Sequence, residues 1–243
     1  MQLKAAGLTH VGMQRSQNQD RFWIDVERQV FLVADGMGGH KGGEIASELA
    51  VSAVKKYFET TISPSGQLQS PEKALREAFF QANQCIQERA KQEPNLQGMG
   101  TTCTLAYLNA NKIWISHVGD SRCYLVRPEQ IWQLTRDHSV VQEKLRAGVI
   151  TRTQLKTDRS KNVLTRSVGF EPFLEIDIYQ MDILSGDTFL LCSDGLYGLV
   201  EDGNIRDVIC NENSLEKTVD TLIATANKNG GNDNVTAIAI KCI

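Results

Sequence analysis

The chain lacks the sequence features of several large classes of protein. Its apolar runs fall short of the roughly 18 residues that suggest a membrane span, and the N-terminal segment MQLKAAGLTHVG has no apolar stretch of a signal peptide. Basic residues are not in excess, because the net charge is −3 and the pI is near 5.9, whereas nucleic-acid-binding proteins normally carry a basic surplus. We therefore expect a cytoplasmic protein that binds neither membranes nor nucleic acids.

Closely paired cysteines are also missing. None of the six cysteines belongs to a CxxC pair, which a zinc site or a thiol redox motif would require. None is followed by Arg six positions later, so the loop of cysteine-dependent phosphatases is absent as well. Several lie in apolar runs, and we expect buried free thiols, which suits a reducing compartment.

Internal repeats, low-complexity tracts and long linkers are absent too. With 243 residues, 41% hydrophobic and 23% charged, the chain has the composition of an ordinary globular protein. This length is within the range of one large domain. We expect residues 1–243 to form a single domain without an obligate partner, that is, a monomer.

Periodicity predicts short strands and a few amphipathic helices. Helical spacing of apolar residues is found at 44–62, 71–93 and 214–228. A polar, partly helical insert is expected at about 138–167. The predicted strands are short and often joined as hairpins, and they cover about 5–12, 21–26, 30–34, several pieces of 100–134, 174–180, 187–192 and 235–243. Strands that do not alternate one-for-one with helices favour antiparallel sheets packed face to face, with helices outside.

Aspartates stand at the ends of apolar runs in four separate parts of the chain. Asp35, Asp120 and Asp194 follow predicted strands, and Asp233 opens the last one. A carboxylate at the edge of a core is costly unless it is paired or bound to a cation. Four such positions suggest strand ends that converge on divalent metal, and ligation by oxygen alone favours Mg²⁺ or Mn²⁺.

Two further residues belong to this pattern. Arg15 carries the planar fork that matches a phosphate, and Asp20, in the same RSQNQDRF segment, would support the metal centre. A surface ion pair is the alternative for these two residues.

Six motifs occur together in one order: RxxNQD from 15, DGMGGH from 35, GTT from 100, GDSR from 119, SDG from 193 and GxDN from 231. In this combination the chain resembles the metal-dependent Ser/Thr protein phosphatases, the PP2C or PPM family. It resembles the short bacterial form of the family, and most of all the cyanobacterial members. The resemblance runs essentially from end to end. It implies an α+β fold, a four-layer α/β/β/α sandwich of two antiparallel sheets flanked by helices.

The resemblance also implies a metal-binding hydrolase that acts in signal transduction. Such an enzyme removes phosphate from phosphoserine and phosphothreonine in phosphoprotein substrates, and possible action on phosphotyrosine is left open. A water activated by two Mn²⁺ or Mg²⁺ ions would attack without a covalent intermediate. The resemblance implies six metal ligands: Asp20, Asp35, the carbonyl of Gly36, Asp120, Asp194 and Asp233. Asp120 and Asp194 would bind a third, weaker ion. Arg15 would hold the phosphate.

Two predictions concern residues near this site. His40 is a candidate general acid for the leaving alkoxide, and the alternative is that it only caps the following helix or binds water. The segment 145–168 matches the family's flap, and its basic residues would steer acidic phosphoproteins towards the metals. A solvated, mobile surface is the alternative for the flap. For the whole chain, a phospho-dependent binding module and a hydrolase of small phosphoesters remain open.

Overall fold

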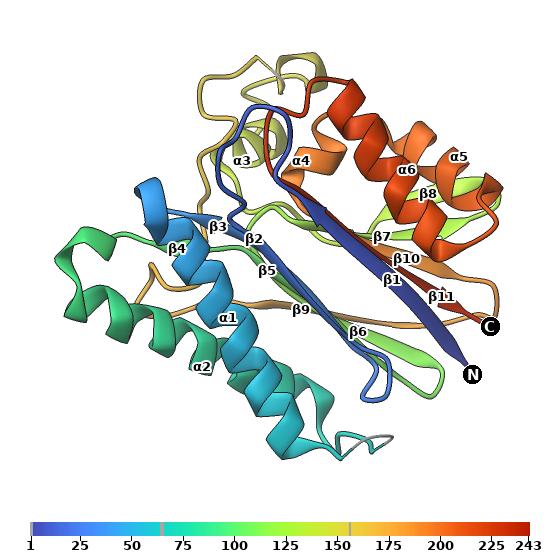
Figure 1. Ribbon diagram of the computed structural model, residues 1–243, viewed down its shortest axis with the longest axis horizontal. Helices are drawn as coiled ribbons and strands as arrows, with labels where there is room; N and C mark the ends of the chain where they lie inside the picture. The colour runs from blue at the N-terminus through green and yellow to red at the C-terminus, as the bar shows by residue number, and fades with distance from the viewer. Residues whose placement is uncertain (1, 64–65, 156) are drawn as a thin grey trace.

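The computed structural model describes residues 2–63, 66–155 and 157–243, except for the side chain of His40. Two antiparallel sheets lie face to face, and helices cover the outer face of each sheet (Figure 1). The predicted α+β sandwich is therefore confirmed.

Two strands of the first sheet, β3 (Val30–Met37) and β5 (Cys103–Asn109), are buried on both faces. In β3, Val30 and Leu32 belong to the core beneath the helices, whereas Phe31 and Val33 belong to the core between the sheets. Because successive side chains of a strand point to opposite faces, an unbroken apolar run fills both cores. The order is β2 (Asp20–Asp25), β3, β5, β6 (Lys112–Val118) and β9 (Asp177–Asp182), with β4 (Gly100–Thr101) paired to β3.

The second sheet brings the two ends of the chain together. Its order is β1 (Leu3–His10), β11 (Val235–Cys242), β10 (Thr188–Cys192), β7 (Arg122–Arg127) and β8 (Gln130–Gln133). β1 pairs with β11 along its whole length, so both termini lie at one edge (Figure 1). In β11, Ile238 and Ile240 face the inter-sheet core, and Ala237 and Ala239 face the helices.

Two helices cover each sheet. The first sheet is covered by α1 (Gly39–Thr61) and α2 (Pro71–Gln92), and the second by α5 (Asp202–Asn211) and α6 (Leu215–Lys228) (Figure 1). The 3₁₀ turn η1 (Pro94–Leu96) follows α2, and the short helix α4 (Asp194–Tyr197) follows β10.

Three helices differ from the sequence prediction. α1 begins at Gly39 and not near 44, because the glycine-rich start of this helix carries no apolar repeat. α5 and α4 were not predicted at all. In α5, Ile205 is the one residue that is fully buried, so an amphipathic pattern is hardly visible there.

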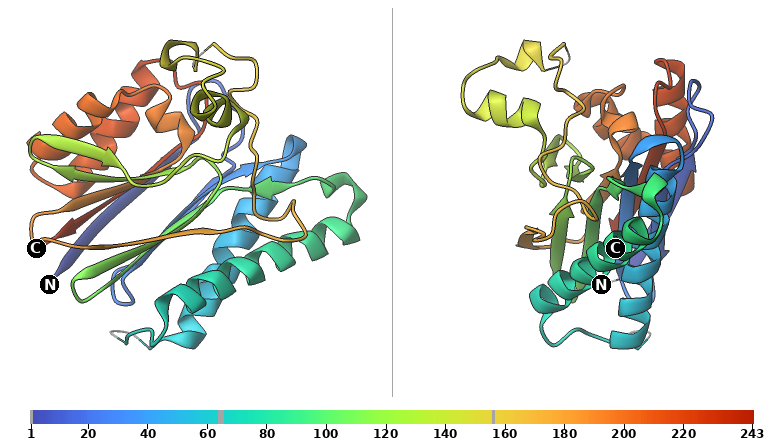
Figure 2. Two further views of the ribbon diagram at one scale, coloured as in Figure 1. Left: turned by 180° about the vertical axis from the view of Figure 1, so that it is seen from behind. Right: turned by 90° about the vertical axis from the view of Figure 1, so that its left-hand side faces the viewer.

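The polar insert between β8 and β9 projects beyond the sandwich (Figure 2). It contains α3 (Val140–Arg146) and the 3₁₀ turn η2 (Arg152–Gln154). Its base is closed by backbone hydrogen bonds, from Val140 N to Val163 O at 2.8 Å and from Thr165 N to His138 O at 2.9 Å. A further bond, from His138 N to Gly119 O at 2.8 Å, attaches this base to the end of β6. Among the described residues, no helix is both long enough and apolar enough to cross a bilayer.

Candidate metal centre

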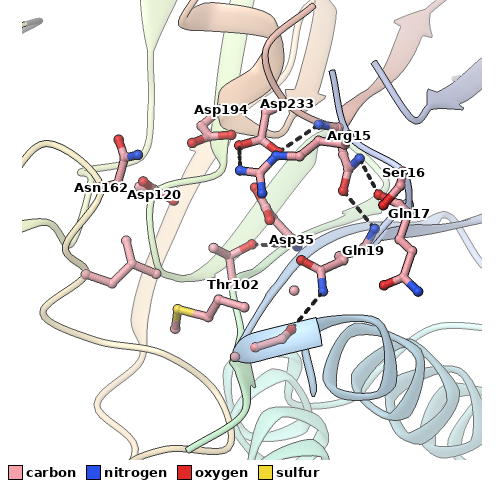
Figure 3. A pocket seen from close by; sticks show the side chains of 16 residues that line it. Arg15, Ser16, Gln17, Gln19, Asp35, Thr102, Asp120, Asn162, Asp194 and Asp233 are labelled. Atoms are coloured by element: carbon pink, nitrogen blue, oxygen red, sulfur yellow. Dashed lines mark hydrogen bonds and ion pairs between the residues drawn. The ribbon is translucent and has the colours of Figure 1, made fainter. Parts of the chain in front are cut away.

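A cavity of about 490 Å³ opens at one end of the sandwich. Five of the six predicted ligands line it, namely Asp35, Gly36, Asp120, Asp194 and Asp233. The four aspartates and Arg15 are shown in Figure 3. Residues separated by up to 218 positions thus meet in one place.

Strand pairing explains why these carboxylates meet. Asp35 lies near the end of β3, Asp120 follows β6, and Asp194 opens α4 directly after β10. Asp233 lies in the loop before β11. The prediction that Asp233 opens this strand is wrong, because β11 begins at Val235. β3 and β6 both run antiparallel to β5, so Asp35 and Asp120 lie at the same end of the first sheet. β10 runs antiparallel to β11, so Asp194 and Asp233 lie at the same end of the second sheet. All four line one cavity, so these two ends meet.

Asp35 is held from below by two threonines. Its backbone N–H donates to Thr102 Oγ1 at 2.9 Å, and Thr101 Oγ1 donates to its carbonyl oxygen at 2.9 Å. Thr102 Oγ1 also shares a 2.7 Å hydrogen bond with Ser121 Oγ. Thr101 and Thr102 therefore support the backbone of Asp35 under the site.

Asp20 lies behind the cavity wall, opposite Asp35 in the register of β2 and β3. Its side chain is fully buried, and its Oδ2 accepts hydrogen bonds from Ser193 Oγ at 2.7 Å and Thr236 Oγ1 at 2.6 Å. Its Oδ1 is buried without a hydrogen-bond donor. Burial raises the pKa of Asp20 to about 6, against the effect of both hydrogen bonds.

The carboxylates of the cavity repel one another. Burial, and then the charges of Asp20, Asp194 and Asp120, raise the pKa of Asp35 well above its ordinary value. Burial and neighbouring aspartates likewise raise the pKa of Asp120 well above normal and that of Asp194 to about 7. Groups that resist ionisation for lack of a counter-charge are those that a divalent cation would stabilise.

The donor set fits a hard cation. Carboxylate oxygens line the cavity, and Gly36 adds a backbone carbonyl nearby. In the described part of the chain, no three acidic, histidine or cysteine side chains are already gathered tightly enough to hold an ion. The carboxylates are therefore spread around the cavity.

Arg15 reaches into the same cavity from the loop after β1. Its Nη2 donates to Asp233 Oδ2 at 2.7 Å, and its side chain is 52% exposed. Asn234 ties this loop to the Asp233 turn, since its Nδ2 donates to the carbonyls of Val11 and Gln17 and its Oδ1 accepts from Gln19 N. Asn234 therefore orients this turn. The alternative of a surface ion pair holds for Arg15, whose partner is Asp233, but not for Asp20, which is fully buried.

Gly36 is required by the closeness of β3 to the start of α1. A Cβ atom at this position would run into the carbonyl oxygen of Gly43. Glycine therefore brings the helix against the strand at the cavity wall. His40 lies in the first turn of α1, but its side chain is outside the described residues, so its predicted role as a general acid stays a prediction.

Two residues of the polar insert, Asn162 and Leu164, also line the cavity, and none of the six motifs includes them. Asn162 lies beside Asp120 (Figure 3). No local sequence signal marks Asn162, because only the folding of the insert over the sheet edge brings it there.

Comparison with known proteins agrees with this geometry. The profile of the family described as Protein phosphatase 2C matches residues 7–238. The chain belongs to the protein phosphatase 2C family. The resemblance drawn from the six motifs is thereby confirmed.

Other members of the protein phosphatase 2C family are similar over nearly the whole chain. The serine/threonine phosphatase Stp of Listeria welshimeri is 37% identical over 96% of this chain and 93% of its own. The crystal structure of Stp1 from Staphylococcus aureus superposes with a TM-score of 0.93 at 32% identity, covering 100% of this chain and 96% of that one. The catalytic domain of the phosphatase PstP, in complex with 2 manganese ions, gives a TM-score of 0.87 at 31% identity, with 98% and 97% covered.

Proposed function

We propose that this member of the protein phosphatase 2C family is a Mn²⁺- or Mg²⁺-dependent hydrolase that removes phosphate from phosphoserine and phosphothreonine in proteins. The observation that carries the proposal is the set of mutually repelling carboxylates around one open cavity. The relatives named as serine/threonine phosphatases, and the neighbour that holds manganese, support the same chemistry.

The aspartates divide the cations between them in this proposal. Asp35, Asp194 and Asp233 would hold the first ion, and Asp35 with the Gly36 carbonyl would hold the second. Asp20, which lies behind the cavity wall, would contribute to the second ion directly or through a water molecule. Asp120 and Asp194 would hold a third, weaker ion. When bound, these ions supply an attacking water of lowered pKa and neutralise the phosphate charge.

Arg15 has a separate task. Asp233 engages one of its terminal nitrogens and so orients the guanidinium across the cavity. The remaining N–H groups are available to bind two phosphate oxygens, an arrangement that stabilises negative charge on the phosphoryl group during the reaction. His40 would give the proton that the leaving serine or threonine oxygen needs.

The wider setting of the enzyme is also a proposal. We expect one catalytic domain over residues 1–243, with 145–168 as a flap, acting as a cytoplasmic monomer. The six cysteines are all free thiols, which suits a reducing compartment. Helices of the chain itself cover the outer faces of both sheets, which supports a monomer (Figure 1).

Phosphate release from a phosphothreonine peptide tests the function. It would be measured in chelator and then with Mn²⁺, for the wild type and for Asp194→Ala, with circular dichroism to show that both are folded. Release that requires metal and disappears in the variant supports the proposal. Failure of the folded wild type to release phosphate under any metal would overturn it and favour a phospho-dependent binding module. Release from a small phosphoester but from no peptide would favour a small-molecule hydrolase instead.

A further inference from the structure

The basic residues of the insert are not equivalent in the structure. Arg166 is balanced by acidic partners, with Nη1 at 3.0 Å from Asp177 and Nη2 at 2.9 Å from Glu175. Its charge is therefore used to attach the end of the insert to the body of the protein. Lys156 lies outside the described residues. Three other basic side chains of the insert have no carboxylate within 4.0 Å among the residues that the structure describes, namely Arg152, Arg159 and Lys161. Their charges are therefore available to bind an anionic ligand.

A fixed turn holds Lys161. Asp158 accepts hydrogen bonds from the backbone N–H of Ser160 at 2.8 Å and from Lys144 Nζ of α3 at 3.0 Å. The hydrogen bonds from Ser160, and then the Lys144 contact, lower the pKa of Asp158 to about 2. The side chain of Asp158 is only 14% exposed. The turn is thus tied to α3 by a carboxylate that stays ionised at neutral pH, and Lys161 follows directly.

Lys161 lines a second cavity, of about 390 Å³, that lies under the insert. This cavity shares three residues with the first one, namely Asp120, Asn162 and Asp194. The two cavities are therefore adjacent, so a peptide whose phosphate occupies the first would place a neighbouring side chain at the second. Since the spacing of adjacent Cα atoms is only about 3.8 Å, the nearest neighbours of the phosphorylated residue would reach it.

The lining of the second cavity includes both charged and apolar side chains. Its aspartates are Asp137, which is paired with Arg122, and Asp120 and Asp194, which the proposed metal ions would neutralise. Val141, Leu155 and Tyr197 provide apolar walls. The other cation there, Arg122, is already engaged by Asp137, with Nε at 3.0 Å from Oδ1 and Nη2 at 2.7 Å from Oδ2. Lys161 is accordingly the cation of this cavity that has no carboxylate partner in the described part of the chain.

We propose that the second cavity is a subsite for a residue next to the phosphoserine or phosphothreonine, and that Lys161 selects an Asp or Glu side chain there. The inference rests on the proposed function. The apolar walls would cover the methylene groups of the side chain, and the Lys161 ammonium would pair with its carboxylate. Because the subsite is local, it selects the position of the acidic residue, whereas steering by the whole insert would reward acidic charge anywhere in the peptide.

Five phosphothreonine peptides would test the subsite. One has alanine at every neighbouring position, and the other four carry a single Glu at −2, −1, +1 or +2. The measured quantity is the ratio of kcat/KM for each Glu peptide to that of the alanine peptide, with Mn²⁺ at low and at physiological salt. Dissociation constants of the same peptides, with a non-hydrolysable phosphonate in place of the phosphate, provide a readout that is independent of turnover.

The variants Lys161→Ala, Lys161→Glu and Arg159→Ala would then be compared. Arg159 is the matched control, because it is a basic residue two positions away that lines neither cavity. In the wild type we expect one position of Glu to raise kcat/KM about two- to five-fold, the range of a partly exposed ion pair. Lys161→Ala should bring that ratio to about 1, Lys161→Glu should bring it below 1, and Arg159→Ala should keep the wild-type ratio.

Two results would overturn the subsite while leaving the phosphatase intact. One is equal kcat/KM for all five peptides in the wild type, and the other is a positional preference that survives in both Lys161 variants. An equal loss of preference in Arg159→Ala would assign the effect to steering by the whole insert. If the wild type released phosphate from none of the peptides under any metal, the proposed function itself would fail.

Discussion

At the scale of single residues, the aspartates of the cavity determine the energetics of the site. Each one would ionise readily in water, but burial and its neighbours oppose the charge. The folded, metal-free protein therefore carries an electrostatic cost that the active site needs for metal binding. Loss of stability in exchange for function at such a cluster is common.

Replacement of Asp194 by Asn separates the effect of this carboxylate on the stability of the metal-free protein from its effect on metal-dependent activity. Because burial and neighbouring charges raise the pKa of Asp194 to about 7, the neutral amide should stabilise the metal-free protein at pH 7.5 by about 1–3 kcal/mol. Metal-dependent phosphate release should fall at least about 100-fold, since a ligand is lost. Urea unfolding in chelator measures the first effect. Asp220→Asn, at an exposed position of α6, should change neither, and a destabilised Asp194→Asn protein would contradict the electrostatic argument.

The predicted proton donation by His40 has its own test. His40→Ala should slow hydrolysis of an alkyl phosphoester by about 100-fold or more, because a poor leaving group needs the proton. An activated aryl phosphate leaves without protonation and should be hydrolysed at nearly the wild-type rate. Steady-state kinetics on both substrates decide the matter, and equal losses would show that His40 is not the acid.

At the scale of elements, the close approach of β3 to α1 forms one wall of the cavity. Gly36→Ala would place a methyl group against the Gly43 carbonyl, which we expect to cost about 2–4 kcal/mol and to displace Asp35. Thermal unfolding and kcat would both be measured. The control is Gly203→Ala in α5, where nothing lies within 4 Å of the added atom and alanine should stabilise the helix by about 0.5–1 kcal/mol. Wild-type stability of Gly36→Ala would refute this account of the wall.

For the whole molecule, stability should depend jointly on pH and metal. An aspartate has a pKa of about 3.9 in the unfolded chain, whereas burial raises that of Asp20 to about 6 and that of Asp194 to about 7 in the folded protein. Between these values the folded state holds more protons than the unfolded state, so the metal-free protein loses stability as the pH rises from about 4 to about 7. Bound Mn²⁺ cancels this loss, because the ionised carboxylates are then paired with a cation.

The difference in unfolding temperature between protein with Mn²⁺ and protein in chelator should therefore increase from pH 5 to pH 7 and then level off. Differential scanning fluorimetry across this range measures it. The Asp194→Asn protein provides the comparison, since its metal-free stability should fall less steeply with pH. A metal effect that is constant from pH 5 to pH 7.5 would contradict the linkage.

The order and type of most elements followed from local patterns. The unbroken apolar runs of β3 and β11, and the apolar stripes of α2 and α6, are properties of contiguous residues, so local patterns predicted these elements. The early start of α1 and the short helix α5 were missed because tertiary packing stabilises them without a clear apolar repeat. The same distinction applies to the candidate site.

The sequence by itself determined the chemistry of this protein: aspartates at strand ends, glycines beside them, an arginine suited to phosphate, and motifs that together identify the family. Only the tertiary structure decided how these groups are used. It placed Asp20 behind the cavity wall, joined Arg15 to Asp233 across 218 positions, and directed Arg166 to the body of the protein while Lys161 faces a cavity. The physical reason is that periodicity and motif spacing describe neighbours along the chain. Burial, pairing and pKa depend instead on groups that become neighbours only when both sheets and the insert are packed.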